Sequence, residues 1–244
     1  MYVSIDLNCD LGEGVGCDAA LMPLITSANI ACGAHAGDEA TMRATVALAR
    51  AHGVAVGAHP GFADRANFGR VEHALSACAL HDLVTEQIEA LLELGSVRHV
   101  KPHGALYNLA ARDRAVAEVI AEAVYACDSS LILFGLAGSE LVRAGLARGL
   151  RVANEVFADR TYQPDGSLTP RSRSDSLITD EATAVAQVIR MVREGVVLAT
   201  DGTSIAVVAD TICLHGDGAH AVAFARRLGG ELRASGIALR EWGA

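Results

Sequence analysis

Short apolar runs alternate with stretches of helical periodicity along nearly the whole chain of 244 residues. We predict strands over eight of the apolar runs, at 3–8, 27–32, 54–59, 98–103, 131–136, 151–157, 205–209 and 211–216. Between them, residues 38–53 and 76–95 show the helical pattern, with Asp38 as an N-cap and with Gly53 and Gly95 at the ends. Such alternation is typical of right-handed βαβ units around a mainly parallel sheet.

The length and continuity of the chain predict its fold class. No low-complexity linker divides it, 51% of its residues are hydrophobic, and its length is the usual size of a single α/β barrel. We therefore expect one α/β domain over residues 1–244, an irregular (β/α) barrel of seven or eight mainly parallel strands. A doubly wound open sheet is the alternative.

Charge and composition exclude several classes of function. The chain has 20 Lys and Arg against 29 Asp and Glu and only one Trp, so we expect neither a nucleic-acid partner nor a membrane surface. No apolar segment approaches a membrane span, and the start MYVSIDLNCD lacks the basic region of a signal peptide. Six cysteines occur without CxxC spacing. We therefore expect a cytoplasmic protein with reduced thiols.

Four histidines occur in similar turns directly after apolar runs. They are His35 in GAHAG, His59 in GAHPG, His103 in KPHG and His215 in LHGD. The glycine that follows each of them allows a sharp turn into the next helix. A single histidine of this kind often only bonds a buried backbone carbonyl, but four at equivalent strand ends indicate one shared site.

Alternation within the predicted strands places polar residues opposite the apolar ones. Asn8 and Asp10 alternate with apolar neighbours in VSIDLNCD, and Lys101 and Glu155 do so in RHVKPHG and RVANEVF. If the apolar face packs on outer helices, these polar side chains point into the barrel near the carboxyl ends of its strands. Barrel enzymes keep their active sites at that end, where helix N-termini also favour anions.

The charged residues of this face indicate acid–base chemistry. Asp10 and Glu13 lie together in NCDLGEG, where burial would raise the pKa of at least one carboxyl. A buried Lys101 requires a carboxylate partner, for which Asp10 and Glu155 are the candidates, and it could then polarise a carbonyl or hold a substrate carboxylate. The alternatives are a capping role for Asp10, a solvated Glu13 and a purely structural ion pair.

Residues 157–180 interrupt the alternation. The segment FADRTYQPDGSLTPRSRSDSLITD contains two prolines, a QPDG turn signal and three arginines, Arg160, Arg171 and Arg173. Its basic content stands out in an acidic chain, so we expect a lid over the substrate rather than a solvated excursion.

Motifs for phosphate, metal and covalent acyl chemistry are weak or missing. GEGVG at 12–16 follows a strand but matches neither GxGxxG nor the P-loop, so any ATP dependence needs a different kind of site or a partner protein. The spacings HExxH, HxH and CxxC are missing, so we expect no metal, although the histidines and carboxylates are suitable donors. GxSxG is missing too.

Several motifs in order resemble the LamB/YcsF family. They are DLNCDLGEG, TSANIACGAHAGD, GVAVGAHPGF, HVKPHGALYN, LILFGLAGSEL, EVFADRTYQPDGSLTPRS and TICLHGD. The resemblance implies an irregular barrel of the glycoside hydrolase/deacetylase type. It also implies ring opening of 5-oxo-L-proline to L-glutamate, coupled to hydrolysis of ATP, with Mg²⁺ held by the complex. The partners that it implies are the B and C subunits of 5-oxoprolinase.

For that reaction we expect roles for the residues of the shared site. Four would be catalytic, namely Asp10, His59, Lys101 and Glu155. Among them, either carboxylate would be the base, and Lys101 would hold developing negative charge. Six further residues would bind substrate: Asn8, Glu13, His35, His103, Arg160 and His215. The alternatives are a stand-alone metal-dependent amide hydrolase or deacetylase, and a non-catalytic subunit that only binds substrate.

Overall fold

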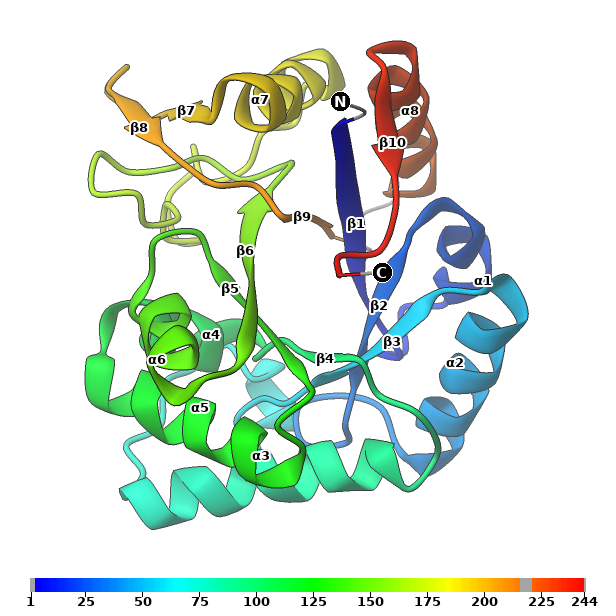
Figure 1. The fold of residues 1–244 in the computed structure, drawn as a ribbon, viewed down its shortest axis with the longest axis vertical. Coiled ribbons are helices and arrows are strands. Elements are labelled where there is room, and N and C mark those ends of the chain that lie inside the picture. Colours follow the sequence, from blue (N-terminus) through cyan, green and yellow to red (C-terminus); the bar gives the residue numbers. More distant parts are fainter. Residues whose placement is uncertain (1–2, 216–220, 244) are drawn as a thin grey trace.

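The computed structural model describes residues 3–215 and 221–243, and within them seven parallel strands form a closed barrel (Figure 1). The strands are β1 (Val3–Leu11), β2 (Ser27–Ala31), β3 (Ala55–His59), β4 (His99–Val100), β5 (Ile132–Leu136), β6 (Arg151–Phe157) and β9 (Thr211–Leu214). Each pairs with the next, and β9 closes the barrel by pairing with β1. The predicted irregular (β/α) barrel is confirmed, and the open sheet is excluded.

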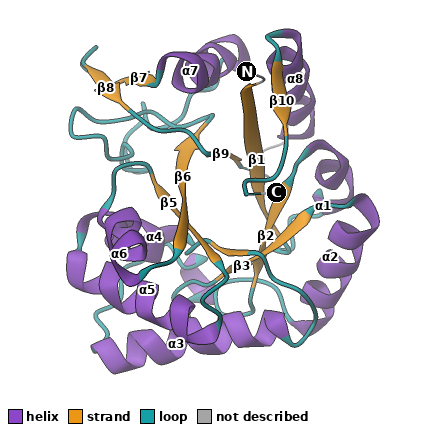
Figure 2. Cartoon of the chain, viewed as in Figure 1, coloured by secondary structure: helices purple, strands orange, loops and turns teal. Residues whose placement is uncertain are grey.

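Helices surround the strands on the outside of the barrel (Figure 2). They are α1 (Asp18–Leu21), α2 (Glu39–His52), α3 (Ala77–Leu92), α4 (Gly104–Arg112), α5 (Arg114–Cys127), α6 (Glu140–Arg148), α7 (Glu181–Glu194) and α8 (Ala221–Ala234), with the 3₁₀ turns η1 (Met22–Leu24) and η2 (Arg65–Asn67). The side chain of Asp38 caps α2, and Gly53 ends it in the left-handed conformation, as predicted. Among the described residues, no helix is long and apolar enough to span a membrane.

Two strand predictions need correction. The run 205–209 is not a barrel strand, because β8 (Ser204–Ala206) pairs antiparallel with β7 (Val196–Leu198) in a separate sheet. A strand that the sequence pattern did not reveal, β10 (Ile237–Leu239), instead pairs with the first residues of β1. Both elements have only three residues, too few for alternation to be recognised. Gly216 of the predicted last strand, and Asp217 of the LHGD turn, lie outside the described residues.

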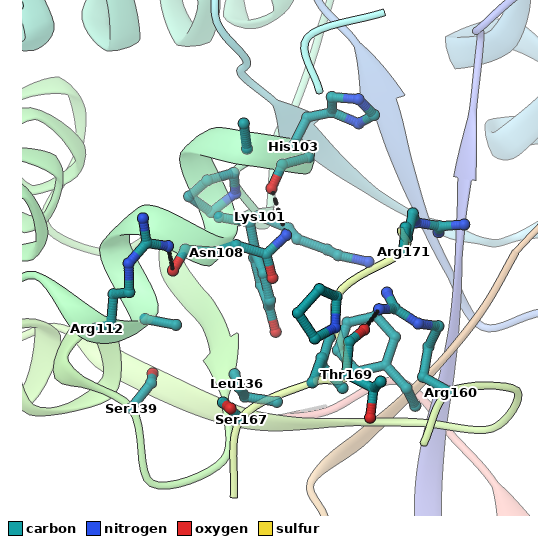
Figure 3. Close-up of a pocket in the computed structure, with 18 of the residues that line it drawn as sticks. Lys101, His103, Asn108, Arg112, Leu136, Ser139, Arg160, Ser167, Thr169 and Arg171 are labelled. Atoms are coloured by element: carbon teal, nitrogen blue, oxygen red, sulfur yellow. Dashed lines mark hydrogen bonds between the residues drawn. The ribbon is translucent and has the colours of Figure 1, made fainter. Parts of the chain in front are cut away.

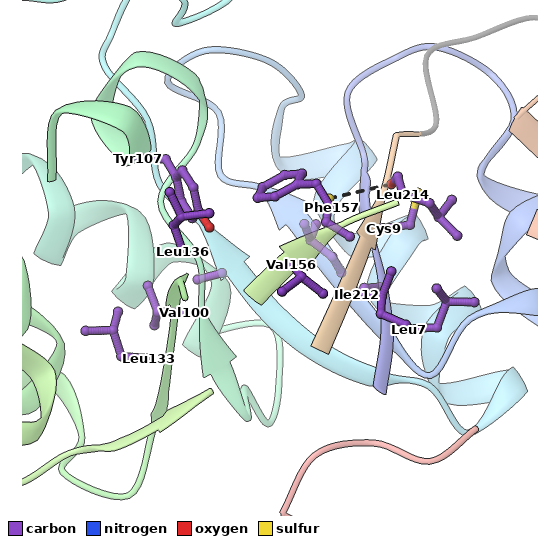
Figure 4. Close-up of a cluster of buried hydrophobic side chains, with 14 of the residues drawn as sticks. Leu7, Cys9, Val100, Tyr107, Leu133, Leu136, Val156, Phe157, Ile212 and Leu214 are labelled. Atoms are coloured by element: carbon purple, nitrogen blue, oxygen red, sulfur yellow. Dashed lines mark hydrogen bonds between the residues drawn. The ribbon is translucent and has the colours of Figure 1, made fainter. Parts of the chain in front are cut away.

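The apolar core packs between the barrel strands and the helices. Buried side chains of alternate strand positions gather there, among them Leu7, Val100 and Ile212 (Figure 4). The intervening positions carry polar residues in β1 and at Glu155 of β6, whereas Ile132, Phe134 and Ala153 form a small second apolar cluster. The alternation read from the sequence therefore predicts correctly which side chains face outward.

Polar side chains fill the inside of the barrel in layers that step along β1. Asp6 accepts a 2.7 Å hydrogen bond from the hydroxyl of Ser27 and a second from that of Thr211. One step further along the strand, Asn8 donates to Thr211 at 2.7 Å. Asp10 forms the next layer, at the carboxyl ends of the strands, where the interior opens.

Candidate active site

A pocket of about 870 Å³ opens at the carboxyl ends of the barrel strands (Figure 3). Its lining includes residues at or just beyond the ends of six strands, namely Asp10, His59, Lys101, Leu136, Phe157 and His215. These residues are far apart in the sequence and meet because parallel strands end at the same pole. The shared mouth predicted from the four histidine turns and from strand alternation is therefore present.

Lys101 lies at the floor of this pocket between two carboxylates. Its Nζ is 2.9 Å from Asp10 Oδ1 and 2.9 Å from Glu155 Oε1, and its side chain is 3% exposed. The same ammonium donates to Asn8 Oδ1 at 3.3 Å and to Cys213 Sγ at 3.0 Å. Both carboxylate partners proposed for this lysine from the sequence are thus in place.

Asn8 and Glu155 lie beneath Lys101, and neither is among the residues that line the pocket. Asn8 donates to Glu155 Oε1 at 2.9 Å, and the Glu155 side chain is completely buried. Their contacts orient the lysine. The structure therefore places neither Glu155, expected as a base, nor Asn8, expected as a substrate ligand, at the surface of the pocket.

The charges of this group depend on one another. Burial opposes ionisation of Asp10, but the positive charges of His59 and Lys101 outweigh burial and hold the pKa of Asp10 well below its usual range. Burial likewise disfavours a charged Lys101, but Asp10 and Glu155 raise its pKa well above the ordinary value. Of the two carboxyls expected to include one with a raised pKa, Asp10 is therefore not that one, because Lys101 and His59 lie beside it.

His59 and His103 each use one ring nitrogen to bind the backbone. His59 Nδ1 lies 2.7 Å from the carbonyl oxygen of Lys101, and His103 Nε2 lies 2.9 Å from that of Phe68. A carbonyl only accepts, so each of these nitrogens carries a proton. The remaining nitrogens, His59 Nε2 and His103 Nδ1, face each other at 2.9 Å. Two neutral rings would both present lone pairs there, so a cation belongs at this point, either a proton or a metal ion.

His35 completes the histidine group behind the pocket wall. It stacks on His103 with ring centroids 3.8 Å apart, and neither of its buried ring nitrogens has a hydrogen-bond partner among the described residues. Its Nε2 lies 3.5 Å from Glu13 Oε1, which is 3.4 Å from His103 Nδ1. Burial and the charge of His59 lower the pKa of His35 to about 3 and that of His103 to about 2, so both rings are neutral at pH 7. His35, expected to bind substrate, does not line the pocket.

The segment 157–180 covers one side of the pocket, to which it contributes residues 165–172. Arg160 also lines the pocket, but its guanidinium donates to the carbonyl oxygen of Thr169 at 2.5 Å (Figure 3). It donates to that of Ser176 as well, at 3.2 Å. It therefore braces the loop from within. Arg173 pairs with Asp175 at the surface.

His215 connects this loop to the barrel. Its Nδ1 donates to the carboxylate of Asp159 at 2.8 Å, and its Nε2 accepts from Arg171 at 2.7 Å. Asp159 escaped prediction because it stands in an irregular segment, where alternation carries no information. His215 and Arg171 both line the pocket, so its rim is set by this pair of contacts.

Two more polar residues of the site, Asn29 in β2 and Tyr107 in α4, were not predicted. Asn29 donates to Asn8 Oδ1 at 2.7 Å and to Asp10 Oδ1 at 2.8 Å, and it accepts from His99 Nε2 at 2.8 Å. Its amide in the middle of the apolar run SANIAC could have indicated that Asn29 belongs to the polar interior of the barrel. Tyr107 lines the pocket, and burial together with the charge of Glu155 raises the pKa of its phenol well above the usual value.

The closed parallel barrel, with a charged pocket at the carboxyl ends of its strands, defines a (β/α)-barrel protein with the site architecture of an enzyme. Its fold is similar to that of the peptidoglycan deacetylase PdaC from Bacillus subtilis, with a TM-score of 0.50 and 12% identity over 98% of this chain and 88% of that one. The chain belongs to the LamB/YcsF family, whose model matches residues 5–244.

Individual relatives match nearly the full length of the chain. The A subunit of 5-oxoprolinase from Bacillus subtilis (strain 168) is 55% identical over 96% of this chain and 95% of its own length. That of Tolumonas auensis is 52% identical over 97% and 98%. Among solved structures, the lactam utilization protein from Thermus thermophilus has a TM-score of 0.91 and 44% identity over 98% of this chain and all of that one.

Proposed function

We propose that this chain is the A subunit of a 5-oxoprolinase, a hydrolase that opens the cyclic amide of 5-oxo-L-proline to give L-glutamate. The observation that carries the proposal is the Lys101 ammonium, held between Asp10 and Glu155 at the floor of the pocket. The names of relatives that match nearly the whole chain support the choice of substrate.

The pocket suits a small anion. 5-Oxo-L-proline carries one carboxylate and one amide, and several cationic side chains line the pocket besides Lys101: Arg70, Arg112, Arg143, Arg160 and Arg171. Five carboxylates line the same pocket, and two of them pair with arginines, Glu72 with Arg112 and Glu140 with Arg143. The guanidinium groups at the pocket mouth offer bidentate partners for the substrate carboxylate.

Lys101 and its partner Asp10 can each take part in hydrolysis of the amide. Hydrolysis of an amide builds negative charge on the carbonyl oxygen, and an ammonium already oriented by two carboxylates stabilises that charge with little reorganisation. Asp10 uses Oδ1 for Lys101 and Asn29, while Oδ2 faces His59 at 3.4 Å. Because Asp10 lines the pocket, it can orient the attacking water through this second oxygen.

We extend the proposal to coupling with ATP and to a cytoplasmic complex with the B and C subunits. A five-membered lactam is a poor electrophile, so transfer of a phosphoryl group from MgATP to the amide oxygen would make its carbon open to water. The chain contains no P-loop motif, so we assign the nucleotide to another kind of site or to a partner. The relatives are named as one lettered part of a larger enzyme, which supports the expectation of further subunits.

The test is reconstitution of the chain with its two partner subunits, with glutamate and ADP followed together. Asp10→Asn and Lys101→Met should abolish glutamate formation, whereas Asp82→Asn, at an exposed position of α3, should not change it. Glutamate release by the chain alone without ATP would favour a stand-alone amide hydrolase. Full turnover by both variants at saturating substrate would leave only a substrate-binding role.

A further inference from the structure

Four donor side chains from separate segments meet at one wall of the pocket. Glu13 follows β1, His35 follows β2, His59 ends β3 and His103 precedes α4. One donor atom of each lies within 4.8 Å of those of the other three. This cluster, Glu13–His35–His59–His103, is adjacent to the group of Lys101 but shares no residue with it.

We propose that this cluster binds one divalent transition-metal ion of the Zn²⁺ type. Three imidazoles and one carboxylate form a donor set that Zn²⁺ accepts readily, whereas Mg²⁺ prefers oxygen ligands alone. The neighbouring donor atoms are 2.9 to 3.5 Å apart. Ligands at the corners of a tetrahedral zinc site, with bonds of about 2.0–2.1 Å, are separated by about 3.3 Å.

The outer contacts of His59 and His103 prepare them as ligands. Each ring donates its far N–H to a backbone carbonyl, that of Lys101 or Phe68, and this fixes both the tautomer and the direction of the inner lone pair. Histidines that bind metals are oriented in the same way by second contacts. An ion at this point supplies the cation that the two facing nitrogens require.

His35 gives a second, independent indication of a metal ion. A buried imidazole whose two nitrogens both lack a hydrogen bond to the described residues is costly, and a metal bond would satisfy one of them. The chain makes room for the ring, since a Cβ at Gly61 would lie 2.8 Å from His35 Nδ1. Because His35 and His103 are stacked in parallel, the lone pairs of the two rings do not point at one position. We therefore assign His35 as the fourth and last ligand, which binds the ion only once its ring has rotated.

The position of the cluster gives the ion access to ligands. Glu13, His59 and His103 line the pocket, whereas His35 lies behind its wall. An ion held by Glu13, His59 and His103 alone would keep its fourth position toward the pocket, where it could take water or an oxygen of a bound molecule until His35 binds.

The test uses the untagged full chain, purified without chelator. Its metal content is measured by plasma mass spectrometry. The metal-free protein is then titrated with Zn²⁺ in a calorimeter and with Co²⁺ in the visible spectrometer, where a site with imidazole ligands gives d–d bands. The variants are Glu13→Gln, His103→Ala and His35→Ala, with His52→Ala, at an exposed position of α2, as the matched control.

We expect close to one Zn²⁺ or Co²⁺ per chain, unchanged in His52→Ala. Affinity should fall by about 100-fold or more in His103→Ala and Glu13→Gln, and less in His35→Ala. Glu13→Gln is nearly isosteric, so it keeps the test valid if His103→Ala does not fold. Failure of the wild-type chain to bind either ion, retention of full affinity in both ligand variants, or equal binding of Mg²⁺ would each overturn the proposal.

Discussion

Lys101 Nζ lies 2.9 Å from both Asp10 Oδ1 and Glu155 Oε1, so that one cation is shared by two carboxylates. Asp10 belongs to β1 and Glu155 to β6, which are separated in the barrel by β9. The lysine therefore ties distant strands together at the floor of the pocket. The charge of Lys101 therefore contributes both to activity and to the free energy of unfolding, and substitutions can separate these two contributions.

Replacing Lys101 with Met removes the cation shared by the two carboxylates and leaves the completely buried Glu155 without its ion pair. We expect a loss of about 3–5 kcal/mol in the free energy of unfolding, measured by urea denaturation. Glu155→Gln in the same chain removes one of the stranded charges and should restore a large part of that stability without restoring glutamate formation. Recovery of both together would show that the lysine acts only through the fold.

Gly57 faces His99 inside the barrel, and a Cβ at this position would lie 2.0 Å from His99 Nε2. Gly57→Ala should therefore destabilise the protein by about 3 kcal/mol. The double variant with His99→Ala should be less destabilised than the sum of the two single variants, because the added methyl group then has space. At Gly230 in α8 an added Cβ would meet no described side chain or other segment within 4 Å, so Gly230→Ala should instead stabilise slightly, by about 0.5–1 kcal/mol. Equal effects at both glycines in thermal melts would contradict this account.

Asp6 gives the protein a pH dependence of stability in the acidic range. Burial, only partly offset by its hydroxyl partners, raises its pKa from 3.8 to about 6. Between these values the folded state binds more protons than the unfolded state, so the stability from this group is full below pH 3.8 and falls as the pH rises to 6. The difference corresponds to about 3 kcal/mol.

The Asp6 contribution is measured by comparing urea unfolding of the wild type and Asp6→Asn across about pH 4 to 7. The wild type should lose stability relative to the variant as the pH rises, because Asn carries no charge at any pH. Asp82→Asn, at an exposed position, should run parallel to the wild type. Parallel curves for all three proteins would refute the assignment to Asp6.

Arg160 braces the loop over the pocket from within, through the carbonyl oxygens of Thr169 and Ser176. Arg160→Met keeps most of the side-chain volume but frees both carbonyls. We expect faster proteolytic cleavage between 163 and 176, together with a KM for 5-oxo-L-proline raised by about tenfold or more and a smaller change in kcat. Arg173→Ala, which removes a surface pair with Asp175 in the same loop, is the matched control and should match the wild type in both measurements.

Regular strands made much of the site predictable. Alternation alone indicated that Asp10, Lys101 and Glu155 share the inner face, because side chains of a strand take opposite sides in turn. It could not indicate which of them reaches the pocket. That depends on depth along the barrel axis, and Glu155 lies below the rim while Asp10 lies at it. Depth is set by the stagger between strands, which no single strand encodes.

Irregular segments were less predictable. Asp159 and the contacts of Arg160 depend on the path of a loop, and the cluster of Glu13 with three histidines assembles from four segments without any fixed spacing. Metal motifs are recognisable in sequence when the ligands share one helix or turn. Ligands that come from neighbouring strand ends become close only when the barrel closes.

The polar layers along β1 determine which positions of such a protein can accept amino-acid substitutions. Thr211 links Asp6 to Asn8, and Asn29 links Asn8 to Asp10, so a substitution at one level disturbs the alignment of the next. Variation that alters ligand preference without loss of folding should therefore accumulate in the 157–180 loop and among the arginines at the pocket mouth. Asp6, Asn8 and Asp10, by contrast, should be replaceable only together with their hydrogen-bond partners. Laboratory evolution that randomises one of these positions at a time should yield mostly unfolded chains.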